Sequence, residues 1–426
     1  MTKVLPFNGL RYVGKDLSAV TTPPYDIISP QQQKAFYEMD RDNVIRLEYG
    51  YQLPEDTDSD NRYTRAAAEL GRMLDEKVLA CDEKPCFYIY EEIFSHAGRD
   101  MSLKGVIGIV ELSEFSEKKV LPHEETLSKA KTDRFELMKA TDCNFSQIYS
   151  LYNDEKGELP GLINSLSAGE PDVSFVAFDG LRQNVWIVSD KESTDRISEL
   201  FADKQLFIAD GHHRYETALN YKKYKEASGA QGDLWKYCMM FLVDMSDPGL
   251  VVYPTHRIVR GIENFDGDAL LSSIRENFDV APIDKADAER LLEENSDKNA
   301  FVLYFDGKCF LLILNDPEAM EQALPEKGKE YRGLDVSVLH TLILEKALKI
   351  DKENMAKQIN LTYTRDADEG LRAVDGKEAD CVFLLNGTKV SQIKEISLVN
   401  EKMPQKSTYF YPKLITGIVM NSLINR

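Results

Sequence analysis

Helical and β-like hydrophobic patterns alternate along the chain. In residues 60–80 apolar side chains recur every three or four positions, which predicts an amphipathic helix. A shorter helix is expected after Ser29, because Pro30 suits the first position of a helix. Residues 86–94 and 101–112 are rich in β-forming side chains, and the short polar stretch between them predicts a hairpin.

The rest of the chain continues this alternation without a long linker. Two strand–helix alternations are predicted over residues 145–205. The apolar run 205–209 predicts a strand that leads directly into Asp-Gly-His-His-Arg at 210–214. Residues 316–332 are charged and interrupted by Gly and Pro, so they are the most linker-like segment. Further strands are predicted at 237–243, 251–253, 358–363 and 381–385. This mixed order predicts an α+β fold with a mixed central β-sheet and flanking helices.

Length sets the expected number of domains. A chain of 426 residues predicts two or three domains at roughly 150 residues each. The pattern suggests an N-terminal α/β region at 1–120, a central core with an insert at 121–260, and a C-terminal α/β region at 261–426.

Charge and composition narrow the function classes. The chain has 52 basic and 72 acidic side chains, a net charge of −20, which repels phosphate backbones and anionic lipid. Neither nucleic acid nor membrane is therefore expected as a partner. No apolar run approaches the roughly 18–20 residues of a membrane span, and the first residues lack a secretory pattern, so a cytoplasmic protein is expected. The six cysteines are widely spread, which favours buried thiols in a reducing compartment over a metal cluster.

The segment 210–214 contains the strongest chemical signal. Asp210 is expected at the N-cap of the helix that follows. The backbone N–H groups of Gly211, His212 and His213 would then lack intrahelical acceptors and attract an anion, and the Arg214 guanidinium can bind phosphate oxygens in pairs. The alternative is an ordinary capping turn with two surface histidines. A metal site is disfavoured, because adjacent helical side chains point about 100° apart.

A second candidate segment begins with Pro-His-Glu-Glu and becomes helical within residues 121–140. Leu127 stands where a zincin helix needs a second histidine, which excludes that motif. Glu124 and Glu125 fit the first turn of a helix, where acidic side chains complement the dipole. Alternatively, a carboxylate beside a phosphate site takes a proton from a hydroxyl nucleophile. Lys131 and Arg134 follow on the same helix and supply positive charge.

Other polar positions leave two interpretations open. Asp244 and Asp247 cap a turn or bind magnesium, and the turn cap is the simpler reading. His256 and Arg257 form either a surface pair or part of a functional site. The chain contains neither a Walker motif nor a Gly-x-Gly-x-x-Gly fingerprint, so a nucleotide would have to bind by another route.

Four separated segments, in order, resemble the bacterial and archaeal DUF1015 family. They are residues 22–29, residues 122–126 with 131–134, residues 209–215, and the tail 403–414. The resemblance covers essentially the whole chain. It implies no function by itself, because the family is poorly characterised.

A more distant similarity does imply chemistry. The Pro-His-Glu and Asp-Gly-His-His-Arg segments resemble the core of the ParB/sulfiredoxin-like fold, and within it the free-serine kinases. The resemblance implies that Glu124 is the base, that phosphate is bound by Gly211, His212, His213 and Arg214, and that Asp210 caps the helix, holds Mg²⁺ or assists transfer together with His213. Sulfiredoxin activity is not expected, because histidines replace its cysteine.

This resemblance predicts a small-molecule phosphotransferase, with ATP or ADP as donor, Mg²⁺ as cofactor, and free L-serine or a similar hydroxyl metabolite as acceptor. The alternative is a ParB-like nucleotide-binding regulator without kinase activity, and a DNA-binding regulator is a weaker one. A homodimer is compatible with the sequence. The candidate substrate-binding residues are Tyr25, Asp26, His123, Arg134 and Lys406, although the first two also fit a structural corner and the tail around Lys406 also fits an ordinary strand.

Overall fold

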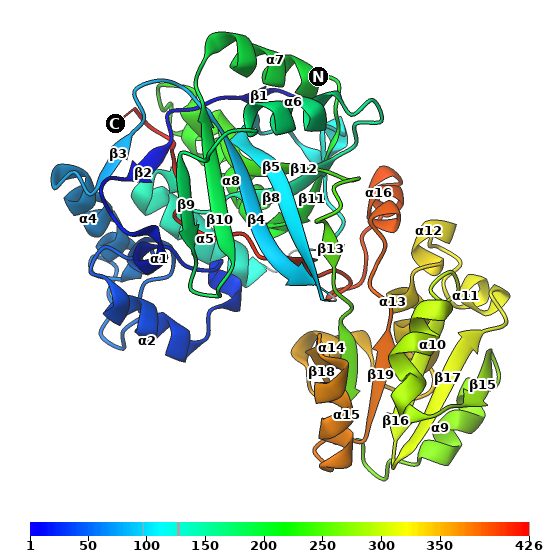
Figure 1. Ribbon diagram of the computed structural model, residues 1–426. Helices are drawn as coiled ribbons and strands as arrows, with labels where there is room; N and C mark the ends of the chain where they lie inside the picture. Colours follow the sequence, from blue (N-terminus) through cyan, green and yellow to red (C-terminus); the bar gives the residue numbers. More distant parts are fainter. Residues whose placement is uncertain (97, 126–127, 426) are drawn as a thin grey trace. The chain divides into compact units, whose positions relative to one another are not determined.

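The computed structural model describes residues 1–96, 98–125 and 128–425 (Figure 1). Its contacts divide the chain into two compact units. The first comprises Met1–Pro122, Thr126–Val251 and Pro412–Arg426, and the second comprises His123–Glu125 and Val252–Tyr411. The red C-terminal end of the chain thus belongs to the unit that contains the blue N-terminus. The three sequence regions 1–120, 121–260 and 261–426 cut the chain at other places, and that division stays a prediction.

The first unit is built on a nine-stranded mixed sheet. Its main path runs β6 (Val120–Leu121), β11 (Leu206–Asp210), β8 (Ile148–Tyr152), β12 (Tyr237–Asp244), β5 (Arg99–Glu111), β4 (Phe87–His96), β10 (Arg182–Val188) and β9 (Val173–Val176), and β1 (Val4–Leu5) also pairs with β5. The pairs β11–β6 and β12–β8 are parallel, and the others are antiparallel. The predicted hairpin is confirmed as β4–β5, with Tyr88 opposite Ile107.

Helices cover one face of this sheet. Every second side chain of the strands points to that face, as Ile89, Val106 and Met240 do. These side chains are fully buried against α6 (Glu158–Leu166), α7 (Lys191–Phe201) and α8 (His212–Ala227). Period-two alternation on the strands and period-3.6 alternation on the helices create this apolar interface, which is the main core of the unit.

The opposite face carries polar aromatic side chains and is covered by both ends of the chain. The Tyr88 hydroxyl accepts a hydrogen bond from Gly9 N at 2.9 Å. Gln147 Nε2 donates to the carbonyl of Ile415 at 3.1 Å. A smaller apolar cluster joins the N-terminal helices to α5 (Ser128–Thr141). Those helices are α1 (Leu17–Val20), α3 (Ile45–Glu48) and α4 (Arg62–Asp75), whereas α2 (Pro30–Met39) packs through Phe36 in a separate cluster with Ile28 and Ile45.

The second unit is a six-stranded antiparallel sheet with helices on both faces. Its order is β15 (Phe278–Pro282), β17 (Lys308–Leu314), β16 (Ala300–Phe305), β19 (Cys381–Leu385), β14 (His256–Val259) and β18 (Leu361–Thr364). One face packs on α9 (Gly267–Ile274), α11 (Glu318–Ala323), α13 (Asp335–Val338), the π-helix η5 (Leu339–Glu345) and α14 (Lys352–Lys357). The other packs on α10 (Ala288–Glu294) and α15 (Ala367–Asp375), while α12 (Lys329–Arg332) contacts α16 (Val390–Leu398).

The remaining strands are short. They are β2 (Leu10–Tyr12), β3 (Leu79–Cys81), β7 (Cys143–Asn144), β13 (Val251–Val252), β20 (Phe410–Tyr411) and β21 (Asn421–Ser422). Single-turn 3₁₀ helices occur at η1 (Tyr25–Ile27), η2 (Phe115–Glu117), η3 (Leu234–Lys236) and η4 (Lys285–Asp287).

The predicted α+β class with a mixed sheet is therefore confirmed. The helix expected after Ser29 is α2, and Ser29 forms a capping box with Gln32. The helix expected in residues 60–80 is α4. The segment 316–332, the most linker-like in sequence, is not a linker, because it contains α11 and α12 and buries Met320 in the core of the second unit. In the described part of the chain, no helix has both the length and the apolar character needed to cross a bilayer.

Candidate functional site

A strand-to-helix turn in the first unit forms the centre of the candidate site. Strand β11 ends at Asp210, and helix α8 starts at His212. Gly211 between them has a φ of 96°, a left-handed conformation that favours glycine. A Cβ at this position would lie 2.8 Å from Nε of Arg214, so glycine also allows the arginine to fold back over the turn.

The prediction that Asp210 is the N-cap of α8 is wrong. Asp210 is still part of β11, where it pairs with Tyr149. Gly211 occupies the N-cap position and contributes no side-chain cap. The N-cap residue of α8 therefore gives no side-chain hydrogen bond to the first N–H groups of the helix. The start of a helix attracts anions through these N–H groups.

The Asp210 carboxylate instead lies between two cations. Its Oδ2 is 2.7 Å from an Arg214 nitrogen, and its Oδ1 is 2.7 Å from Nζ of Lys413. Burial alone would raise the pKa of Asp210, but Lys413 and Arg214 outweigh burial and hold this pKa well below its usual range. Asp210 is thus ionised at neutral pH. Lys413 was not among the residues selected from the sequence, where only its place in the tail motif marked it.

Arg214 is held at a fixed place above the turn. One terminal nitrogen donates to the carbonyl of Gln147 at 2.6 Å, and the other donates to Asp210 at 2.7 Å. A guanidinium has further N–H donors beyond these two. The arginine is therefore fixed by the protein and still has donors for a bound anion.

The two histidines differ in exposure. His212 is buried, which contradicts the interpretation of both as surface side chains, and His213 is half-buried. Burial lowers the pKa of His213, and the charge of Lys131 lowers it further. The charges of Glu216 and Asp26 raise this pKa, but burial outweighs them. His213 is therefore neutral at pH 7 in the free protein.

Tyr25 and Asp26 come to this place from the N-terminal region. They begin the short helix η1, and the charge of the exposed Asp26 acts on His213. The Arg134 guanidinium stacks on the Tyr25 ring, 4.0 Å from its centroid. Burial raises the pKa of Tyr25 to about 12, so its hydroxyl stays protonated. The structure thus brings the Pro-Pro-Tyr-Asp segment and the start of α8 together.

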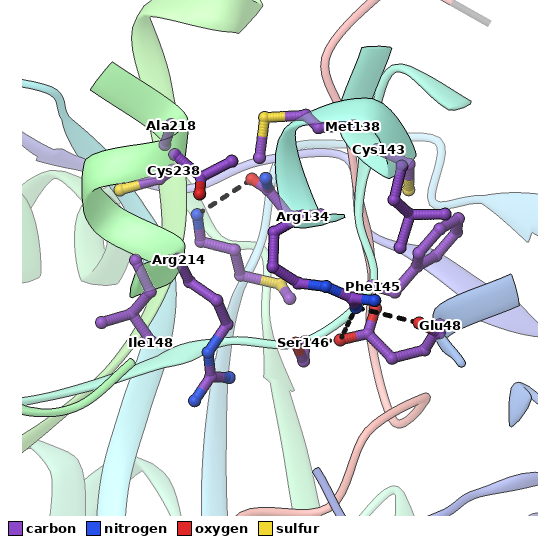
Figure 2. Close-up of a pocket in the computed structure, with 14 residues that line it drawn as sticks. Glu48, Arg134, Met138, Cys143, Phe145, Ser146, Ile148, Arg214, Ala218 and Cys238 are labelled. Carbon is purple, nitrogen blue, oxygen red and sulfur yellow. Dashed lines mark hydrogen bonds and ion pairs between the residues drawn. The ribbon is translucent and has the colours of Figure 1, made fainter. Parts of the chain in front are cut away.

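Arg134 is buried, and Figure 2 shows its side chain beside Glu48 and Ser146. Its guanidinium donates to Asp133 at 2.6 Å and to the carbonyl of Glu48 at 2.9 Å, and it lies 3.4 Å from the Glu48 carboxylate. Ser146 donates to the same carboxylate at 2.9 Å. The protein thus already binds this guanidinium, and its contact with substrate stays a prediction. Sequence reasoning missed Glu48, because no periodicity indicates a buried acid.

A small cavity of about 40 Å³ lies beside this ion pair, between α5 and α8 (Figure 2). Its lining includes Glu48, Arg134, Ser146, Arg214, Cys143 and Cys238. A site needs roughly 10–15 Å³ of such space to hold one water molecule, so the cavity has room for a few waters. Because Arg214 belongs to its lining, the cavity adjoins the candidate phosphate site.

His123, Glu124 and Lys406 belong to the second unit. His123 is buried, and its Nε2 lies 2.9 Å from the Thr408 hydroxyl. Glu124 forms an isolated parallel bridge with Met403 and precedes the described part of α5, so it is not a first-turn residue of that helix. Lys406 is exposed. Residues 126 and 127 lie outside the described residues, and a meeting of Glu124 with the phosphate site stays a prediction.

Two further predictions can be compared with the structure. The surface pair proposed for His256 and Arg257 is wrong, because both side chains are buried. Asp244 accepts hydrogen bonds from the backbone N–H groups of Ser246 and Asp154, as expected for a turn-capping carboxylate. Among the described residues, no three His, Cys, Asp or Glu side chains gather as a metal site.

Comparison with protein families identifies the chain. Residues 4–337 match the family described as "Protein of unknown function (DUF1015)", and the chain belongs to this family. No curated protein matches the sequence significantly.

Solved structures give more distant likenesses. A conserved hypothetical protein from Pyrococcus furiosus is 17% identical, with a TM-score of 0.36 over 74% of this chain and 94% of its own. A free serine kinase in complex with AMP is 14% identical, with a TM-score of 0.37 over 74% of this chain and 90% of its own. SbnI from Staphylococcus aureus, truncated at its C-terminus, is 9% identical, with a TM-score of 0.35 over 73% and 85%. Likenesses this distant carry no function, which must be argued from the local geometry.

Proposed function

We propose that this protein is a phosphotransferase that moves a phosphoryl group from ATP or ADP to a small hydroxyl metabolite such as free L-serine, through a ParB/sulfiredoxin-like core. The observation that supports the proposal best is the turn at Gly211. It combines a helix start without a side-chain cap, a glycine that admits close approach, and a guanidinium fixed directly above it. Backbone N–H groups and an arginine are the donors that phosphate oxygens require.

In the proposed reaction, the acceptor hydroxyl oxygen forms a bond to the terminal phosphorus, and the bond from that phosphorus to the bridging oxygen of the donor breaks. Glu124 accepts the hydroxyl proton, and the released nucleotide keeps the electron pair. His212, His213 and Arg214 bind the phosphate oxygens, whose charge develops during transfer.

The described side chains do not fit a resident Mg²⁺. Asp210, the carboxylate at the turn, already has Lys413 and Arg214 within 2.7 Å. Mg²⁺ commonly arrives bound to nucleotide phosphates and uses few protein ligands. The proposal therefore assigns no protein ligand to Mg²⁺, and Asp210 serves to hold Arg214 and Lys413 at the turn.

Nucleotide binding is the first test. Isothermal titration calorimetry with ATP, ADP and CTP should give saturable binding of an adenine nucleotide by the wild-type protein. Arg214→Ala should weaken that binding at least roughly 10-fold, since a charge-assisted pair contributes about 1.5–3 kcal/mol. Arg196→Ala, an exposed arginine on α7, is the matched control. Binding of no nucleotide at millimolar concentrations would contradict the proposal.

Transfer is the second test. The protein, an adenine nucleotide and L-serine should produce O-phosphoserine, detected by ³¹P NMR or mass spectrometry. Glu124→Gln should reduce kcat by roughly 10²- to 10⁴-fold and leave nucleotide affinity unchanged, because a general base acts only during transfer. Glu125→Gln, the exposed neighbour, is the control. Nucleotide binding without turnover of any hydroxyl acceptor would instead indicate a regulator.

A further inference from the structure

The second unit contains a buried cation that makes no ion pair with any described residue. Arg257 lies on β14, between β18 and β19, and its side chain has no exposed surface. Among the described residues, no carboxylate lies within ion-pair distance of its guanidinium, and the Tyr363 ring, 5.3 Å from Cζ, is the aromatic group beneath it. Burial lowers the pKa of Arg257 to about 10, which leaves it charged at neutral pH. A buried charge without a counter-ion is costly, so its contacts should reveal what it does.

Those contacts join three separate parts of the unit. The guanidinium donates to the carbonyl of Thr255, to the carbonyl of Lys406 at 3.1 Å and to Nε2 of His340 at 3.3 Å. His340 lies in the π-helix η5, and burial holds its pKa well below the usual value, so its neutral ring can accept this bond. Irregular π-turns occur frequently at functional sites. Arg257 therefore connects its own strand, the π-helix and the turn that contains Lys406.

The turn at Lys406 has a conformation that requires support. Lys406 has a φ of 59°, which is unfavourable for a residue with a side chain. The buried Ser407 donates to the carbonyl of Pro404 at 2.5 Å, and its own carbonyl accepts from Thr388 at 2.6 Å. Together with the bond from Arg257, these contacts fix the backbone on both sides of Lys406.

The same turn holds the segment that carries Glu124. The Met403 N–H donates to the carbonyl of His123 at 2.8 Å, and Met403 pairs with Glu124 in a parallel bridge. Thr408, at the other end of the turn, makes the 2.9 Å hydrogen bond with the His123 ring. Residues 403–408 therefore hold His123 at two points: Met403 binds its backbone carbonyl, and Thr408 binds its side chain.

We propose that Arg257 is a positioning residue for the reaction: through the carbonyl of Lys406 it fixes the turn 403–408, and through Thr408 and His123 this turn places the Glu124 carboxylate. This inference rests on the proposed function, and it adds a residue that does not touch substrate. A displacement of a reacting group by about 1 Å can reduce a rate roughly 100-fold, so a small movement of this turn is enough to affect transfer.

The test compares variants along this chain of contacts. Thr408→Val removes the bond to His123 and should reduce kcat at least roughly 10-fold, with the nucleotide KM within about 2-fold of wild type. Thr408→Ser, which keeps the hydroxyl, should restore kcat. Thr362→Val is the control, because its buried hydroxyl on β18 has no hydrogen-bond partner in the described structure. A folded Thr408→Val with wild-type kcat would overturn the proposal.

Arg257→Lys keeps the charge but cannot reach all three acceptors. It should reduce kcat in the same way, and by hydrogen exchange it should expose the Met403 amide at least about 10-fold faster while amides of β17 remain protected. Uniform acceleration of all amides, or an unchanged Met403 amide, would show an ordinary packing role and overturn the proposal. If Arg257→Lys does not fold, the Thr408 pair decides.

Failure of the proposed function gives a different result. In that case the wild-type protein does not transfer phosphate, or Glu124→Gln turns over normally, and the assigned role for Arg257 fails with it. If wild type turns over and Glu124→Gln does not, the proposed function stands. A wild-type kcat in the Thr408→Val and Arg257→Lys variants would then contradict only the positioning role.

Discussion

Asp210 and Lys413 lie 203 positions apart in the sequence and form an ion pair of 2.7 Å at the start of helix α8. The lysine comes from the C-terminal segment, which returns to the first unit after the chain has formed the second. Its side chain is mostly buried, with 12% exposure, so the pair is shielded from solvent. This contact connects the end of the chain directly to the candidate phosphate site.

Lys413→Met should destabilise the first unit by about 1–3 kcal/mol, because it leaves Asp210 with Arg214 alone. Asp210 has a lowered pKa in the folded protein, so its contribution to stability is present above its ordinary value of 3.8 and is lost as pH falls through the lower folded value. The variant should therefore lose less stability on acidification than the wild-type protein. Urea unfolding at pH 7 and at a pH well below 3.8 measures both effects, because the difference in acid sensitivity develops only as pH falls through the folded pKa values.

Lys413→Arg, which retains the charge, is the control for this experiment. Equal unfolding free energies for wild type and Lys413→Met at both pH values would contradict a stabilising role of the pair.

Gly211→Ala should destabilise the protein by about 1–3 kcal/mol, since alanine is strained at a φ of 96° and its Cβ would displace Arg214. It should also weaken nucleotide binding, because the arginine loses its place. Gly161→Ala is the matched control: Gly161 lies within helix α6, where an added Cβ has nothing within 4 Å. That variant should stabilise by about 0.4–1 kcal/mol. Thermal unfolding with and without nucleotide distinguishes the two glycines.

Glu92→Gln should stabilise the protein at alkaline pH. The Glu92 side chain on β4 is completely buried, and burial raises its pKa from 4.5 to about 8, outweighing the opposite effect of Tyr90 and Gln183. The folded state therefore keeps a proton that the unfolded state loses, and stability falls as pH rises from 4.5 to about 8. Glutamine has no proton to lose, so the variant should gain on the order of 5 kcal/mol over wild type at pH 8.5 and little at pH 4.5.

The adjacent Glu91 provides the control. Burial would raise its pKa, but hydrogen bonds from Ser102 and Asn184 outweigh burial and lower it. Glu91→Gln should therefore destabilise the protein at neutral pH. A pH-independent difference between wild type and Glu92→Gln would contradict the assignment of a buried neutral acid.

Nucleotide binding should take up protons near pH 6.5 if phosphate binds beside His213. Burial lowers the pKa of His213 in the free protein, and a phosphate anion would raise it, so affinity should increase roughly 3- to 10-fold as pH falls from 7.5 to 6. Calorimetry in two buffers of different ionisation enthalpy measures the uptake. His213→Gln should abolish the proton uptake, and an unchanged uptake in this variant would place the titrating group elsewhere.

Local physics made several elements predictable from sequence. Ser29 and Gln32 satisfy each other's backbone at the start of α2, and the hydrophobic period of α4 appears within a single helix. The turn at Gly211 follows from an apolar strand that ends in Asp-Gly, although the cap was assigned one residue too early. Such features depend on neighbours only a few positions away, and the sequence contains all of them.

The tertiary structure decided which distant groups share an environment. It paired Asp210 with Lys413, buried Glu48 against Arg134 and buried Arg257 where no described carboxylate pairs with it. The sequence by itself determined the alternation of strands and helices, the absence of a long linker and the residue types at the α8 turn. The ion-pair partners and the pKa values of these side chains could not be predicted from the sequence, because burial and Coulomb interaction depend on distances in space that hydrophobic periodicity does not encode.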